Sequence, residues 1–189
     1  MTENFLRCMR QVWINEGVIN GETGDYTEDG TTTRFGIAYE FNQPELAQFG
    51  IYRPDQMNLL TEEIAAEIYW DKYWIKSGAE SLPKGVDYLV FDAAVNQGPG
   101  YAARMVQECL NTLMGEEVLK VDGMIGPKTR SLMLTVGPQA GSMKAIVRLH
   151  RQMDYYRRLT NLARKNISMF EHKGTDFEAS WLRRIWHNV

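Results

Sequence analysis

Apolar side chains recur at helical spacing along most of the chain, and this periodicity restricts the fold more than any other feature of the sequence. Steps of three and four residues place such side chains on one face of an α-helix. The predicted helices occupy residues 5–16, 62–76, 86–95, 101–114, 127–137, 142–165 and 176–189. The segment 86–95 is apolar on nearly every side, which is typical of a central buried helix. The sequence therefore predicts a mainly α-helical protein.

One stretch interrupts the helical pattern directly after the first predicted helix. Residues 18–36 lose the periodicity and contain the β-favouring run 31–33, which consists of three threonines. Glycines punctuate the same stretch at positions 21, 24, 30 and 36. This composition predicts a loop followed by a short β-hairpin, which is the one candidate sheet of the chain.

Length and composition limit the number of domains and the compartment. With 189 residues, of which 44% are hydrophobic, the chain suits one domain, or one domain with a closely packed extension. No apolar run approaches the roughly 20 residues of a membrane-spanning helix. Residues 1–16 carry charges where a signal peptide would be apolar, so we expect a protein made in the cytoplasm. Cys8 and Cys109 form no C-x-x-C pair, and we expect both to be reduced core residues.

The net charge of −3 conceals an uneven distribution. Residues 1–138 contain 11 basic and 20 acidic side chains, a balance of −9, whereas residues 139–189 contain 10 basic and 4 acidic ones, a balance of +6. The cations that could form a stripe are Arg148, Arg151, Arg157, Arg158, Arg164, Lys165, Arg183 and Arg184. Such a stripe would attract an anionic cell wall or membrane, and the alternative is a solvated helix face. No motif of a nucleic-acid-binding protein is present, so we expect no nucleic-acid partner.

Carboxylate chemistry is the class of catalysis that the sequence supports best. The three histidines, His150, His172 and His187, have no paired metal-ligand spacing. The sequence contains no nucleophile elbow of the G-x-S-x-G type. It also contains no glycine motif of the kind that binds phosphate or a dinucleotide. We therefore expect neither a metal nor a cofactor.

Glu16 is the first acid to consider, because it continues the apolar stripe of Phe5, Met9 and Val12 and precedes Gly17. Partial desolvation and the negative end of the helix dipole both disfavour the ionised carboxylate. A carboxyl group that stays protonated near neutral pH is what a glycosidase uses as general acid. The alternative is an ordinary last-turn residue that points to water.

Glycosidases usually place a second carboxyl group across the scissile bond, as nucleophile or as base. Asp25, Glu28 and Asp29 all lie in the glycine-containing loop after Glu16. Aspartate and glycine are also common turn formers, so the loop alone does not distinguish these candidates.

Four stretches of the sequence carry a family resemblance. Glu16-Gly17 and the loop leading to Gly30–Ile37 resemble the pattern E-G-G followed by D-x-G-G-x-T-x-x-G-I. The stretch Tyr69–Trp74 resembles Y-W-x-x-Y, and Phe91–Gly100 is very close to F-D-A-A-V-N-x-G-P-G. Val121–Thr129 matches V-D-G-x-I-G-P-x-T. Together these motifs resemble glycoside hydrolase family 108 and the predicted peptidoglycan-binding region that follows it.

This resemblance implies an N-acetylmuramidase with a lysozyme-like α+β fold, which cleaves peptidoglycan between N-acetylmuramic acid and N-acetylglucosamine. The muramidase region would comprise residues 1–98, and the helical peptidoglycan-binding region residues 99–189, packed with the first as one compact unit. Glu16 would be the general acid by direct match. The loop is three residues longer than the family pattern, so the second carboxylate stays open.

Three positions compete for that second carboxylate. Counting back from Thr33, which matches the family threonine, reaches Glu28, and one residue of slippage reaches Asp29. Asp25 competes with them because Glu16, Asp25 and Thr31 have the acid, aspartate and threonine spacing of many phage lysozymes. Asp29 ranks slightly ahead of Asp25. By the same resemblance, Thr33 would hydrogen-bond the attacking water or the sugar, and a plain surface threonine is the alternative.

Candidate substrate contacts are Thr31, Asp92, Asn96 and Trp70. Asp92 and Asn96 are four residues apart on an otherwise apolar helix, where polar groups need partners. They would brace a cleft or contact an N-acetyl group, and satisfying the core is the alternative. Trp70 would stack on a sugar or pack in the core.

The resemblance favours a phage endolysin that acts on peptidoglycan strands in the periplasm of the host. Such an enzyme would be made in the host bacterial cytoplasm, would act as a monomer and would need a holin-type export partner. The alternatives are a lytic transglycosylase, a bacterial secretion-associated muramidase and a non-catalytic wall-binding protein.

Overall fold

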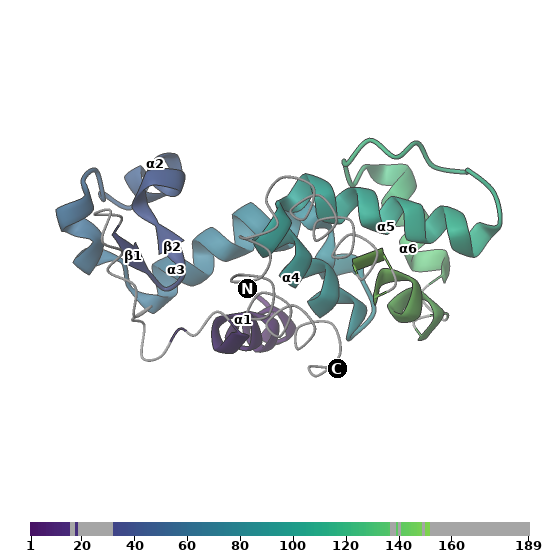
Figure 1. Ribbon diagram of the computed structural model, residues 1–189, viewed down its shortest axis with the longest axis horizontal. Coiled ribbons are helices and arrows are strands. Elements are labelled where there is room, and N and C mark those ends of the chain that lie inside the picture. The colour runs from purple at the N-terminus through teal and green to yellow at the C-terminus, as the bar shows by residue number, and fades with distance from the viewer. Residues whose placement is uncertain (16–17, 19–31, 137–138, 140, 149, 152–189) are drawn as a thin grey trace, which may run out of the picture. The chain divides into compact units, whose positions relative to one another are not determined.

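The computed structural model describes residues 1–15, 18, 32–136, 139, 141–148 and 150–151 of the chain. These residues are mostly helical, with one small antiparallel hairpin after the first helix (Figure 1). The predicted mainly α, lysozyme-like α+β fold is confirmed. The chain divides into two compact units, Met1–Tyr73 and Trp74–Val189. Among the described helices, none has the length and apolar character that crossing a membrane would require.

The first unit begins with the predicted amphipathic helix. Helix α1 (Glu3–Asn15) buries the side chains of Phe5, Cys8, Met9, Val12 and Trp13. The elements that follow it are β1 (Thr33–Arg34), β2 (Ile37–Ala38), α2 (Tyr39–Ala47), the 3₁₀ helix η1 (Pro54–Leu59) and α3 (Glu62–Tyr69). The side chain of Thr61 accepts a hydrogen bond from the Ile64 N–H at 3.3 Å and so caps the N-terminus of α3.

The helix predicted over residues 62–76 changes its winding after α3. Residues Trp70–Ile75 form the π-helix η2, which continues from the first unit into the second. A π-helical turn is wider than an α-helical one and frequently occurs at functional sites. Local periodicity does not reveal such a turn, because the apolar positions shift by only one residue.

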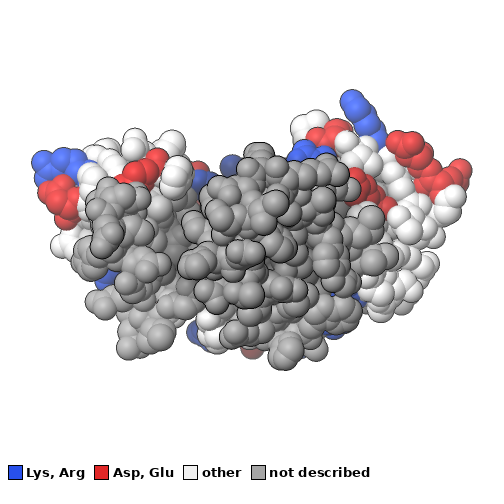
Figure 2. Space-filling model, in the orientation of Figure 1, with Lys and Arg blue, Asp and Glu red and all other residues white. Residues whose placement is uncertain are grey.

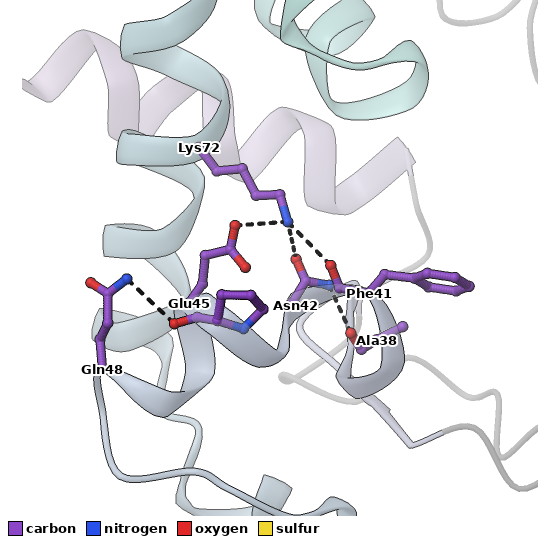
Figure 3. A network of polar contacts seen from close by, with 7 residues as sticks. Ala38, Phe41, Asn42, Glu45, Gln48 and Lys72 are labelled. Atoms are coloured by element: carbon purple, nitrogen blue, oxygen red, sulfur yellow. Dashed lines mark hydrogen bonds and ion pairs between the residues drawn. The ribbon is translucent and has the colours of Figure 1, made fainter.

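Lys72, in η2, holds the bent helix α2 through three contacts (Figure 3). Pro44 disturbs the preceding turn of α2, and Asn42 has the non-helical angles φ −133° and ψ 18°. The Lys72 ammonium donates to the carbonyl of Phe41 at 3.3 Å and to the Asn42 side-chain oxygen at 2.8 Å, and it pairs with the Glu45 carboxylate at 3.0 Å. The Phe41 carbonyl next to the bend therefore has a hydrogen-bond donor, while the Phe41 ring points away from Lys72.

The second unit is built around the predicted central helix. Helix α4 (Val86–Gln97) buries every residue from Val86 to Ala94, so the prediction of a helix apolar on nearly all sides is confirmed. It packs against α5 (Pro99–Met114) and the short 3₁₀ helix η3 (Ala79–Ser81). The Trp74 indole is fully buried and meets the Phe91 ring edge-on, with the ring centroids 5.3 Å apart.

Two boundaries in the second unit show how proline begins a helix. The gap between the helices predicted over residues 86–95 and 101–114 is narrower than expected, because Gly98, with φ 91°, ends α4 and Pro99 already begins α5. Proline suits the first helical position, since its φ is fixed near the helical value and no N–H is needed there. Helix α6 (Pro127–Val136) begins at proline as predicted. Residues 142–148 of the predicted helix 142–165 are helical as well, and the helical stretch begins at residue 141.

Cys109 supplies a test of the packing between helices of the second unit. Neither cysteine forms a disulfide, and both are fully buried, as predicted. Burial raises the pKa of the Cys109 thiol from 9.0 to about 12. Because the thiolate is the reactive form, we expect Cys109 in a Cys8→Ser variant to resist a thiol-specific disulfide reagent at pH 8 and to react promptly in denaturing urea. Fast labelling of the folded protein would contradict this burial.

The free energy of unfolding should also fall as the pH rises from 9.0 to about 12, because in this range the Cys109 thiol ionises only in the unfolded chain.

Candidate functional site

The predicted catalytic carboxylates lie just beyond α1. Glu16 follows the last residue of this helix in sequence, and Glu16, Asp25, Glu28, Asp29 and Thr31 all fall outside the residues that the structure describes. Their roles stay predictions. The chain is described on both sides of Glu16, however. The Val18 N–H donates to the Trp13 carbonyl at 2.9 Å, which satisfies one of the carbonyl groups that the end of α1 leaves free.

Thr33 belongs to the hairpin that packs against this end of α1. It pairs with Ala38, and Arg34 pairs with Ile37, so Phe35 and Gly36 form a two-residue turn. Thr33 is half-buried. The hairpin continues into α2 through the Tyr39 N–H, which donates to the Thr32 carbonyl at 3.0 Å. The predicted role of Thr33 towards water or sugar stays a prediction.

An aromatic cluster of Trp13, Phe35 and Tyr69 fixes the hairpin turn. The centroids of the Trp13 and Phe35 rings are 5.4 Å apart, and those of Trp13 and Tyr69 are 6.1 Å apart. The Tyr69 hydroxyl donates to the Phe35 carbonyl at 3.2 Å inside the core. Sequence reasoning did not identify this cluster, because its members come from three elements that are far apart in the chain. The sequence did contain one signal of this cluster, which is the bulky Phe35 directly before the turn glycine Gly36.

Trp70 packs inside the first unit. Its ring meets the Phe5 ring edge-on at a centroid distance of 5.0 Å, and the side chain is half-buried. This contact joins η2 to α1 and gives Trp70 a structural role. Its predicted stacking on a sugar stays a prediction.

Asp92 and Asn96 lie on α4 in the second unit, where Asp92 is fully buried. The Asp92 carboxylate pairs with the guanidinium of Arg151, which is also fully buried. Arg151 further donates to the Leu89 carbonyl at 3.3 Å, and the Asn96 side-chain amide donates to the Asp92 carbonyl at 2.8 Å. These contacts give Asp92 a structural role, and substrate contact by Asp92 and Asn96 stays a prediction.

Burial of Arg151 changes the composition of the predicted basic stripe. Arg151 belongs to the core of the second unit, so its inclusion among surface cations is wrong. Arg148 is half-buried, and the stripe cations from Arg157 onward lie beyond the described residues. On the face shown in Figure 2, the acidic and basic side chains of the described residues are interspersed.

The stretch 121–124, in the predicted peptidoglycan-binding region 99–189, is joined to α5 by hydrogen bonds from amide side chains. The Gln107 amide donates to the Asp122 carboxylate at 2.8 Å and to the Met124 carbonyl at 3.0 Å, and it accepts from the Gly123 N–H at 2.9 Å. The Asn111 amide donates to the Leu119 carbonyl and accepts from the Leu119 N–H, at 2.8 Å in each case. The hydrogen bond from Gln107, followed by that from the Met124 N–H, lowers the pKa of Asp122 below its ordinary value. These hydrogen bonds therefore hold the chain around residues 119–124 against α5.

In the part of the chain that the structure describes, no group of three or more His, Cys, Asp or Glu side chains has the arrangement of a metal site.

Comparison with known proteins identifies the family. Residues 9–98 match the family described as Glycosyl hydrolase 108, and no curated protein matches the chain. Among solved structures, the structure of Brucella abortus SagA is similar in fold, with a TM-score of 0.60 and 24% sequence identity over 96% of this chain and 91% of that chain. The matched residues include most of α1, the hairpin, α2, α3 and the whole of α4. Residues 9–98 therefore resemble a glycosyl hydrolase family 108 domain, and the chain is a glycoside hydrolase.

Proposed function

We propose that the chain is an N-acetylmuramidase that hydrolyses the bond between N-acetylmuramic acid and N-acetylglucosamine, with Glu16 as general acid. The observation that carries the proposal is that the hairpin turn lies close to the described residues on both sides of Glu16. Trp13 precedes Glu16 by three residues and contacts Phe35, and Val18 follows it by two and approaches Gly36. Both of these flanking residues therefore lie near the hairpin that carries Thr33.

In the proposed reaction, Glu16 donates its proton to the glycosidic oxygen as the bond to the muramic acid carbon breaks. The second carboxylate, with Asp29 ranked ahead of Asp25 and Glu28, either attacks that carbon or removes a proton from the attacking water. Thr33 would orient the water or the sugar. One water molecule is consumed for each bond cleaved, and each product carries an intact sugar end.

The biological role that we propose is that of a phage endolysin. An endolysin made in the host cytoplasm would reach the periplasm with a holin-type partner, and it would act there as a monomer on glycan strands. Residues 99–189 would assist binding to peptidoglycan. The cations from Arg157 onward would attract the anionic wall or membrane, and this attraction would weaken as salt is added. A secretion-associated bacterial muramidase would share the chemistry and differ in its genomic context.

Analysis of the products tests the proposed reaction. We expect digestion of purified sacculi to release muropeptides with reducing N-acetylmuramic acid ends, because water adds across the broken bond. Mass spectrometry distinguishes these ends from 1,6-anhydro-muramic acid, which is lighter by one water molecule. Anhydro ends would identify a lytic transglycosylase instead. Binding to sacculi with no release of reducing sugar would indicate a non-catalytic wall-binding protein.

A further inference from the structure

The turn of the hairpin has an unusual residue at a strained position. Strand register makes Phe35 and Gly36 the two central residues, and both have positive φ, 51° and 74°. Two-residue hairpin turns of this kind favour Asn-Gly or Asp-Gly, because these residues tolerate left-handed backbone angles. A bulky residue with positive φ is an outlier that persists only where its surroundings hold it. The contacts of the Phe35 ring therefore account for a phenylalanine at a position where the positive φ angle disfavours it.

The ring of Phe35 is held on two sides. Its exposed fraction is 6%, and the Trp13 ring lies against it with an interplanar angle of 33°. The guanidinium of Arg34 stands 5.4 Å from the ring centroid. The Tyr69 hydroxyl binds the Phe35 carbonyl, so the backbone and the side chain of the same strained residue are both anchored.

Gly36 allows the backbone of the turn to approach the Tyr69 side chain closely. A Cβ atom at this position would lie 2.7 Å from the Tyr69 hydroxyl oxygen and 3.9 Å from a methyl group of Val18. The first distance is shorter than any relaxed contact, so only glycine fits beneath Tyr69. The second shows that the turn lies close to Val18, the described residue that follows Glu16 and Gly17 in the sequence. Trp13 and Val18 are in turn joined by a backbone hydrogen bond of 2.9 Å.

We propose that the Phe35–Gly36 turn is a positioning element for the acid at Glu16, and that Tyr69 is the positioning residue that locks it. The inference rests on the proposed role of Glu16. The turn contacts Trp13, three residues before Glu16, and lies close to Val18, two residues after it, so it restricts the described chain on both sides of that acid. A general acid must meet the glycosidic oxygen within hydrogen-bond distance, and displacement by about 1 Å can lower the rate by about 10²-fold.

Tyr69→Phe tests this proposal, because it removes the hydrogen bond to the turn and keeps the buried ring. We expect kcat on soluble glycan strands to fall by about ten- to a hundredfold, with KM changed by less than about twofold. The matched control is Tyr73→Phe, one turn further on. The Tyr73 hydroxyl makes no hydrogen bond with any described residue, and its ring packs 5.5 Å from that of Tyr69. Circular dichroism should show that both variants are folded at the assay temperature.

A second variant, Phe35→Asn, separates positioning from turn formation. Asparagine suits the left-handed backbone better than phenylalanine but removes the ring that contacts Trp13. We expect the loss in kcat to equal or exceed that of Tyr69→Phe. Wild-type kcat in either variant would overturn the proposal, as would a change in KM alone. Glu16→Gln is assayed in parallel: if this variant is inactive while Tyr69→Phe is normal, only the positioning role fails, whereas an active Glu16→Gln enzyme overturns the proposed function.

Discussion

Glu16→Gln is expected to lower the rate of peptidoglycan hydrolysis by about 10²- to 10⁴-fold, which is the typical contribution of a general acid. Glutamine has nearly the same size and shape as protonated glutamate but cannot donate a proton to the departing oxygen. The fold should be retained, because the substitution removes a carboxyl group and adds no volume. The measurement is the rate at which purified protein clears chloroform-treated Gram-negative cells, together with the reducing sugar released from sacculi.

Glu3→Gln is the matched control for this experiment. Glu3 lies in the first turn of the same helix, α1, and its side chain is exposed, so the variant makes the same exchange of Glu for Gln while leaving the end of the helix intact. We expect it to clear cells at the wild-type rate. Should Glu16→Gln clear cells as fast as Glu3→Gln, the assignment of the general acid is wrong and the carboxylates of the loop would have to be reconsidered.

Arg151→Met is expected to destabilise the second unit by about 3–5 kcal/mol, which is typical when one partner of a buried ion pair is removed. Arg151 and Asp92 are both fully buried, so the variant would leave the Asp92 carboxylate in the core without its cation. The hydrogen bond from Arg151 to the Leu89 carbonyl would also be lost. The measurement is the midpoint and slope of urea unfolding followed by circular dichroism, from which the free energy of unfolding is obtained.

Two further variants serve as controls for this experiment. Arg130→Met removes an exposed cation of α6 in the same unit and should change the free energy of unfolding by no more than about 0.5 kcal/mol. The double variant Asp92→Leu with Arg151→Met replaces both charges by apolar side chains and should recover most of the lost stability. If Arg151→Met unfolds at the same urea concentration as Arg130→Met, the buried pair does not hold this unit together.

The sequence was sufficient for features that depend on neighbouring residues. The apolar stripe of α1, the all-round apolar character of α4 and the N-cap at Thr61 each arise within one or a few helical turns. The position of the hairpin after α1 followed from the loss of helical periodicity and the run of threonines. Glu16 could be singled out for the same reason, since it is the one acid that continues the stripe of its helix.

Contacts between distant parts of the chain were decided by the tertiary structure alone. Arg151 appeared in the sequence as one more cation of a basic quarter, yet it is buried against Asp92, 59 residues away. Tyr69 lies 34 residues from Phe35, and no local pattern indicated that its hydroxyl would hold a strained turn beside the chain that flanks Glu16. Helical periodicity reports which face of a segment is buried, because it depends on side chains a few residues apart. The partner of that face depends on how the elements pack, which is decided only when the whole unit folds.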